Sequence, residues 1–119
     1  MPVKKGLSPV QRTIRELRNQ GCICDVCEKW VTVPTMPGGG YRKDLFDFID
    51  IIALAPNGIV AIQACGQDFA AHKRKLLNNE YLPEWIKSGG SVQIWGWRKV
   101  LRQRGGKQKI WAARVEGIK

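Results

Sequence analysis

Residues 46–65, FDFIDIIALAPNGIVAIQAC, constrain the fold more than any other stretch of the sequence. Two apolar runs rich in β-branched residues flank a Pro-Asn-Gly turn, which predicts a hairpin of two buried strands. Two polar side chains interrupt these runs: Asp50 near the start of the first strand and Gln63 at the end of the second. A buried carboxylate is costly unless it is paired or holds a cation. We therefore predict that Asp50 and Gln63 converge at one sheet edge around a metal ion.

The remaining patterns predict an α/β fold in which helices flank a mixed sheet, in the order α-β-β-β-α-β-β. Ser8, Pro9 and Gln11 indicate a helix start with a capping box, and Gly21 indicates its end. We expect a disordered basic leader over residues 1–7 and a single domain over residues 8–119. The other expected elements are a strand at 22–33, a Pro/Gly-rich loop at 34–44, the hairpin at 46–63, a helix from Asp68 to Asn79, a connector at 80–90, and strands at 91–97 and 109–118.

The charge of the chain indicates a polyanionic partner. Twenty Lys and Arg residues stand against ten Asp and Glu residues, a formal net charge of +10. Nucleic acid is the first candidate and an acidic membrane surface the second. No apolar run reaches the roughly 18 residues of a membrane span, and no signal peptide is recognisable, so we expect a soluble, cytoplasmic protein. The residues predicted to bind DNA through its phosphates are Arg42, Lys43, Arg98, Lys99, Arg102, Arg104, Lys107 and Lys109.

The four cysteines do not indicate a disulfide framework in a cytosolic chain. Cys24-x-x-Cys27 has the spacing of zinc ligands, with Cys65 and His72 as further candidates. In a strand, however, Cys24 and Cys27 point to opposite faces. Buried free thiols are therefore favoured, and zinc binding stays open.

The placement of Ile49-Asp50 and of Gln63-Ala64-Cys65 between two helices resembles the PD-(D/E)XK nuclease superfamily, and within it the compact Holliday-junction resolvases. By element order the resemblance covers residues 8–97. It implies a restriction-endonuclease-like fold and a Mg²⁺- or Mn²⁺-dependent DNA endonuclease that acts on branched DNA as a homodimer. It also implies that Asp50, Gln63 and Ala64 hold the metal ion.

Two residues depart from the motif of that superfamily. Gln63 replaces a carboxylate and Cys65 replaces the lysine that helps to activate water. Lys73, on the apolar face of the second helix, is a candidate for the missing cation, and Glu16 corresponds to an assisting glutamate on the first helix. Asp44 is a further candidate ligand. Two alternatives stay open: a DNA-binding protein that has lost cleavage, and a small RNA-binding protein.

Overall fold

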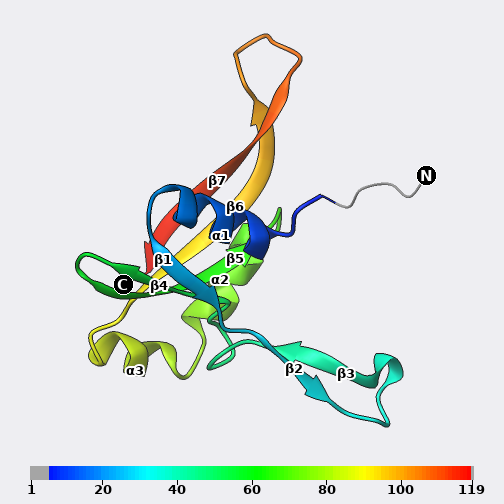
Figure 1. The fold of residues 1–119 in the computed structure, drawn as a ribbon, viewed down its shortest axis with the longest axis vertical. Coiled ribbons are helices and arrows are strands. Elements are labelled where there is room, and N and C mark those ends of the chain that lie inside the picture. Colours follow the sequence, from blue (N-terminus) through cyan, green and yellow to red (C-terminus); the bar gives the residue numbers. More distant parts are fainter. Residues whose placement is uncertain (1–5, 119) are drawn as a thin grey trace.

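The computed structural model describes residues 6–118, so the expected leader at residues 1–7 lies mostly outside the described residues. A five-stranded mixed sheet has the order β1-β4-β5-β6-β7, and β2 and β3 form a separate hairpin (Figure 1). Strands β5 and β6 are parallel and all other neighbours are antiparallel. The elements are α1 (Pro9–Asn19), β1 (Ile23–Val26), β2 (Lys29–Thr32), the 3-10 helix η1 (Pro37–Gly39), β3 (Gly40–Lys43), β4 (Ile51–Ala55), β5 (Gly58–Cys65), α2 (Phe69–Leu77), α3 (Leu82–Lys87), β6 (Ser91–Leu101) and β7 (Lys109–Ile118).

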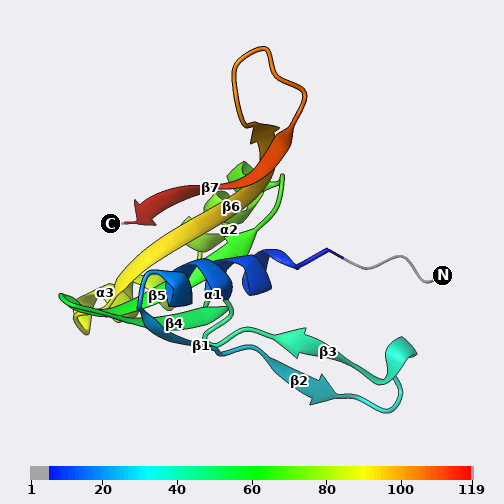
Figure 2. The same cartoon turned by 45° about the horizontal axis from the view of Figure 1, so that its top comes forward.

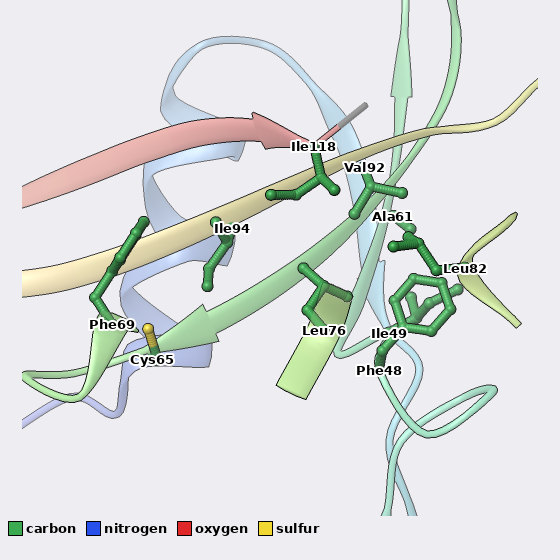
Figure 3. Close-up of a cluster of buried hydrophobic side chains, with 10 residues drawn as sticks. All are labelled: Phe48, Ile49, Ala61, Cys65, Phe69, Leu76, Leu82, Val92, Ile94 and Ile118. Atoms are coloured by element: carbon green, nitrogen blue, oxygen red, sulfur yellow. The ribbon is translucent and has the colours of Figure 1, made fainter. Parts of the chain in front are cut away.

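Helices cover both faces of the five-stranded sheet (Figure 2). On one face α1 packs Ile14 and Leu17 against buried strand residues such as Ile62. On the other face α2 and α3 contribute Phe69, Leu76 and Leu82 to a second apolar cluster (Figure 3). The two helices α2 and α3 form the crossover that joins the parallel strands β5 and β6, because parallel neighbours cannot be joined by a tight turn. The expected mixed α/β sheet flanked by helices is confirmed.

Several expected boundaries are wrong. The strand expected at 22–33 is two strands in different sheets, β1 beside β4 and β2 beside β3. The loop expected at 34–44 contains η1 and β3, and the connector expected at 80–90 contains α3. Strand β6 continues to Leu101, so the basic loop is confined to residues 102–108. In each case pairing or packing with a distant segment decides the conformation, which local sequence patterns do not report.

The start of α1 is as expected. The Ser8 hydroxyl accepts a hydrogen bond from the Gln11 backbone N–H, and the Gln11 side chain accepts one from the Ser8 N–H. This capping box satisfies two of the donors that a helix leaves free at its N-terminus. No helix of residues 6–118 is long and apolar enough to cross a membrane.

A buried polar contact fixes α1 on the sheet. Trp97 Nε1 of β6 donates to Thr13 Oγ1 at 2.9 Å, and the Thr13 hydroxyl donates to the Pro9 carbonyl at 2.7 Å. Thr13 is fully buried. The hydroxyl therefore serves as acceptor and donor at once, in a place that water does not reach.

Replacing Thr13 by valine keeps the side-chain shape but leaves the indole N–H of Trp97 without an acceptor. A buried unsatisfied donor costs about 1–3 kcal/mol, so Thr13→Val should lower the free energy of unfolding by about that amount in urea denaturation. Thr13→Ser, which keeps the hydroxyl, is the matched control and should lose less. A valine variant as stable as the wild type would show that this contact does not hold α1.

Candidate metal centre and basic arm

Three carboxylates meet where the β2–β3 hairpin leaves the main sheet. Glu28 lies between β1 and β2, Asp44 follows β3, and Asp50 precedes β4. Their ligand oxygens all lie within 4.8 Å of one another, and no other group of His, Cys, Asp or Glu within residues 6–118 meets this spacing. We call these three residues the acidic centre. Asp50 is 6% exposed, whereas Glu28 and Asp44 are partly open to solvent.

Hydrogen bonds fix Asp50 between two strands. Its backbone N–H donates to the Ile62 carbonyl of β5 at 3.0 Å, and its carbonyl accepts from the Cys27 N–H at 2.8 Å. Its Oδ2 accepts from the Ala64 N–H of β5 at 2.9 Å. The Asp50 carboxylate therefore accepts the hydrogen bond that a backbone carbonyl would accept if the pairing with β5 continued before the first residue of β4. Its position is set by the sheet rather than by a mobile loop.

The surroundings of Asp50 favour its neutral form when no cation is bound. Burial raises the pKa of Asp50 to about 8; the hydrogen bond with Asp44 and the negative charges of Asp44 and Glu28 act in the same direction, and the Ala64 N–H opposes them. Closely spaced carboxylates resolve their repulsion by retaining a proton. A divalent cation would replace that proton, and carboxylate oxygens are the ligands that Mg²⁺ and Mn²⁺ prefer. The acidic centre therefore fits the implied metal ion.

Gln63 is adjacent to this centre along β5. Its side chain is 7% exposed, and its Oε1 is buried without a hydrogen-bond partner within residues 6–118. The hydrogen bond from β5 to Asp50 comes from the next residue, Ala64. The convergence of the Gln63 amide oxygen with Asp50, and metal binding by Gln63 and Ala64, stay predictions.

Lys73 and Glu16 each contact another side chain in the structure, and their roles at the acidic centre stay predictions. Lys73 Nζ forms an ion pair with Glu116 of β7. Glu116 is paired with Ile94 of β6, which is paired with Gln63 of β5. Two strand spacings of ~4.8 Å place Glu116 about 10 Å from Gln63. On α1, the Glu16 carboxylate accepts a hydrogen bond from Gln20 at 3.1 Å.

The cysteines supply neither a cation nor a second cluster of ligands. Cys24 belongs to the apolar cluster under α1, whereas Cys27 and Cys65 belong to the cluster on the opposite face. Burial raises the pKa of Cys65 to about 11, with the negative charges of Asp68 and Asp50 adding to the effect. The Cys65 thiol is therefore neutral near pH 7 and cannot replace a lysine. The Nε2 atom of His72 lies 2.9 Å from Oδ2 of Asp68.

The sequence did not reveal Glu28 as a member of the acidic centre. It lies in a stretch that we expected to be one continuous strand, where its side chain would be one of several exposed charges. The break in that strand, which turns Glu28 toward Asp50, depends on the pairing of β1 with β4 and of β2 with β3. An acidic residue between two short strand-like runs is a weak signal, and only the distant contacts give it meaning.

Strands β6 and β7 continue beyond the rest of the sheet as a long two-stranded arm (Figure 1). Pairing of β5 with β6 ends at Gly96, so residues 98–112, here called the basic arm, pair only with one another. Trp111 ties the base of the arm to α1: the Arg12 guanidinium lies 3.8 Å from the centroid of its ring, and Lys99 Nζ lies 5.3 Å away. The basic residues predicted to bind DNA that lie on this arm are Arg98, Lys99, Arg102, Arg104, Lys107 and Lys109.

The two other predicted DNA-binding residues, Arg42 and Lys43, lie on β3 in the separate hairpin. Arg42 forms an ion pair with Glu28 of the acidic centre at 3.6 Å. Basic side chains thus flank the acidic centre on the hairpin and also occupy the arm. Comparison of the chain with protein-family models, curated proteins and solved structures finds no match.

The raised pKa of Asp50 predicts how stability depends on pH in the metal-free protein. In the unfolded chain this carboxyl ionises near pH 4, while in the folded chain it keeps its proton to about pH 8. Between these values the folded state binds more protons than the unfolded state, so stability falls as pH rises, by at most about 1.4 kcal/mol per pH unit for one group.

Asp50→Asn should remove this dependence. Between pH 5.5 and pH 8 the wild type should lose more free energy of unfolding than the variant does. Urea denaturation of both proteins in the presence of a chelator measures this. Mg²⁺ or Mn²⁺ should raise the melting temperature of the wild type at pH 8 more than that of Asp50→Asn. An unchanged difference across this range would contradict a buried, protonated Asp50.

Proposed function

We propose that this chain is a Mg²⁺- or Mn²⁺-dependent DNA endonuclease. The observation that carries the proposal is the convergence of Glu28, Asp44 and the buried Asp50 on one point. These three residues would hold a metal ion, which would supply polarisation of a phosphodiester and a lowered pKa of bound water. Three carboxylates within 4.8 Å of one another repel, and the chain has a net charge of +10, so basic side chains for neutralising them are abundant.

The order of elements supports the resemblance to the PD-(D/E)XK nucleases. Without the β2–β3 hairpin and α3, the chain runs α1-β1-β4-β5-α2-β6-β7, which is the expected α-β-β-β-α-β-β order. Asp50 stands at the start of the second strand in this order, and Gln63-Ala64-Cys65 ends the third. A restriction-endonuclease-like fold is therefore the finer description that we propose for this sheet.

In this proposal the protein groups have distinct tasks. Asp50, oriented by the Ala64 N–H, is the central ligand, and Glu28 and Asp44 supply the negative charge that Gln63 lacks. Lys73 can act on a water at this centre only if its ion pair with Glu116 opens. A helper role for Glu16 likewise requires its side chain to leave Gln20.

The basic arm would contact DNA through phosphates. Its Lys and Arg side chains are exposed along both strands and the loop, and they offer charge without the fixed geometry that reads base edges. We propose binding by backbone shape, with branched DNA as the substrate and two copies of the chain acting on symmetric cut sites. Activity in the cytoplasm is part of the same proposal.

A DNA-binding protein without cleavage activity is the second candidate. The neutral thiol of Cys65 and the ion pair that engages Lys73 favour it, because both leave the acidic centre without the lysine of the motif. Binding of DNA is common to the two candidates. Only chemistry at the acidic centre separates them.

A cleavage assay on a four-way junction and on linear duplex DNA tests the proposal. The wild type should cut with Mg²⁺ or Mn²⁺ and not with a chelator, and Asp50→Ala should lower the rate by about 100-fold or more, because the central ligand is gone. Asp25→Asn, which changes an exposed carboxylate of β1, is the control and should cut like the wild type. Equal cutting by wild type and Asp50→Ala would refute the endonuclease; binding without cutting would favour the second candidate.

Alanine at Arg102, Arg104, Lys107 and Lys109 should weaken DNA binding and flatten its salt dependence. Each lost phosphate contact lowers the slope of log affinity against log salt by about 0.9 for duplex DNA. A variant with the same loss of charge elsewhere, at Arg15, Arg18, Arg74 and Lys87, controls for net charge. If the two variants lose the same DNA affinity in fluorescence anisotropy, the arm does not contact DNA. Tighter binding of RNA than of DNA of the same form would favour the RNA-binding alternative.

A further inference from the structure

A cavity of about 330 Å³ opens beside the acidic centre and shares Asp44 with it. Its wall includes two lysines, Lys29 and Lys43, and two aromatic rings, Phe46 and Tyr81, together with a second aspartate, Asp47. The volume is near the lower end of the roughly 300–1,000 Å³ that small-molecule sites occupy. The proposed function does not use this cavity.

The two lysines face each other across the hairpin, and neither has an ion-pair partner within residues 6–118. Lys29 of β2 and Lys43 of β3 are direct partners in the register of the hairpin. Like charges directly opposite each other in a sheet destabilise it. Asp44 and Asp47 line the same cavity and offset part of this charge; a cation held by Asp44 at the acidic centre would leave the lysines to contact phosphate.

The two rings form an exposed aromatic pair on the same cavity. Phe46 is 47% exposed and Tyr81 is 41% exposed, and their ring centroids are 5.8 Å apart. Aromatic side chains that stand open to solvent beside positive charge are typical of sites where nucleic acid bases stack. The cavity thus combines phosphate-binding and base-stacking chemistry.

The backbone that presents Phe46 is strained. Phe46 and Asp47 both have left-handed conformations, with φ of 53° and 64°, which residues other than glycine rarely adopt. The Asn79 side chain donates to the Phe46 carbonyl at 3.1 Å, and the Asp47 N–H donates to the Asp44 carbonyl at 3.1 Å. The fold therefore holds this ring beside the cavity at a cost in conformational energy.

We propose that this cavity binds an unpaired nucleotide adjoining the phosphate at the acidic centre. The base stacks on Phe46 and Tyr81, and the phosphates on either side contact Lys29 and Lys43. A base inside a duplex is covered by its neighbours and cannot reach these rings. The site therefore favours DNA with unpaired nucleotides, such as single strands and the openings at branches. The placement next to a scissile phosphate rests on the proposed endonuclease; the binding itself does not.

Binding measured with a chelator, where no cleavage occurs, tests the inference. The probes are a duplex with one unpaired 2-aminopurine, a single strand and the fully paired duplex. Tyr81→Leu should weaken binding of the first two by about tenfold and leave the paired duplex unaffected, whereas Tyr81→Phe should bind like the wild type. Tyr41→Leu changes an equally exposed aromatic residue outside the cavity and is the control.

Phe46→Leu should act like Tyr81→Leu, but its strained backbone makes it the less certain variant to fold. Tyr81 has an ordinary backbone conformation, with φ of −90°, so its substitution tests the site independently. Equal losses for paired and unpaired DNA, or no loss, would overturn the inference. If wild type fails to cut DNA but Tyr81→Leu still removes the preference, the endonuclease fails and this site stands. If cutting depends on Asp50 but no preference exists, only this site fails.

Discussion

The hydrogen bond from the Ala64 N–H to the carboxylate of Asp50 is the contact on which the arrangement of the site depends. It ends the regular pairing of β4 with β5 and holds an acidic side chain in a place that water barely reaches. The chain immediately before Asp50 must turn back toward β3, which brings Asp44 close, and the pairing of β1 with β4 brings Glu28 from the other side. A backbone contact in the sheet thus assembles three carboxylates from three segments.

The protein could have neutralised Asp50 with one of its many basic side chains, yet no ion pair of Asp50 exists within residues 6–118. Arg42, on the adjoining strand β3, pairs with Glu28 instead. Neutralisation is left to a proton or to a cation from solution. The basic arm carries six lysines and arginines and the β2–β3 hairpin three, and both hairpins project from the main sheet (Figure 1). Positive charge on projecting elements is suited to contact with a polyanion.

Sequence patterns predicted the features that neighbouring residues decide. The capping box of Ser8 and Gln11, the stop at Gly21 and the hairpin around the Pro-Asn-Gly turn are local, and the structure has them. The burial of Asp50 followed from the apolar residues around it. Strand β3 and helix α3 were missed because their stability comes from β2 and from β6 rather than from their own composition. The ion pair of Lys73 with Glu116 could not be read from the sequence either, because Glu116 lies 43 residues further along the chain.

If the acidic centre holds the proposed metal ion, a carboxylate at position 63 would not be required. Negative charge needs to be near the metal ion, but it does not need to come from one strand, because oxygen ligands from any segment serve a hard cation equally well. In the proposed site Glu28 would provide, from between β1 and β2, the negative charge that Gln63 lacks on β5. Three carboxylates around one divalent cation leave a net negative charge that would repel an approaching phosphate. Arg42, Lys29 and Lys43 lie on the adjoining β2–β3 hairpin and would offset that repulsion, because Glu28 directly precedes this hairpin and Asp44 directly follows it.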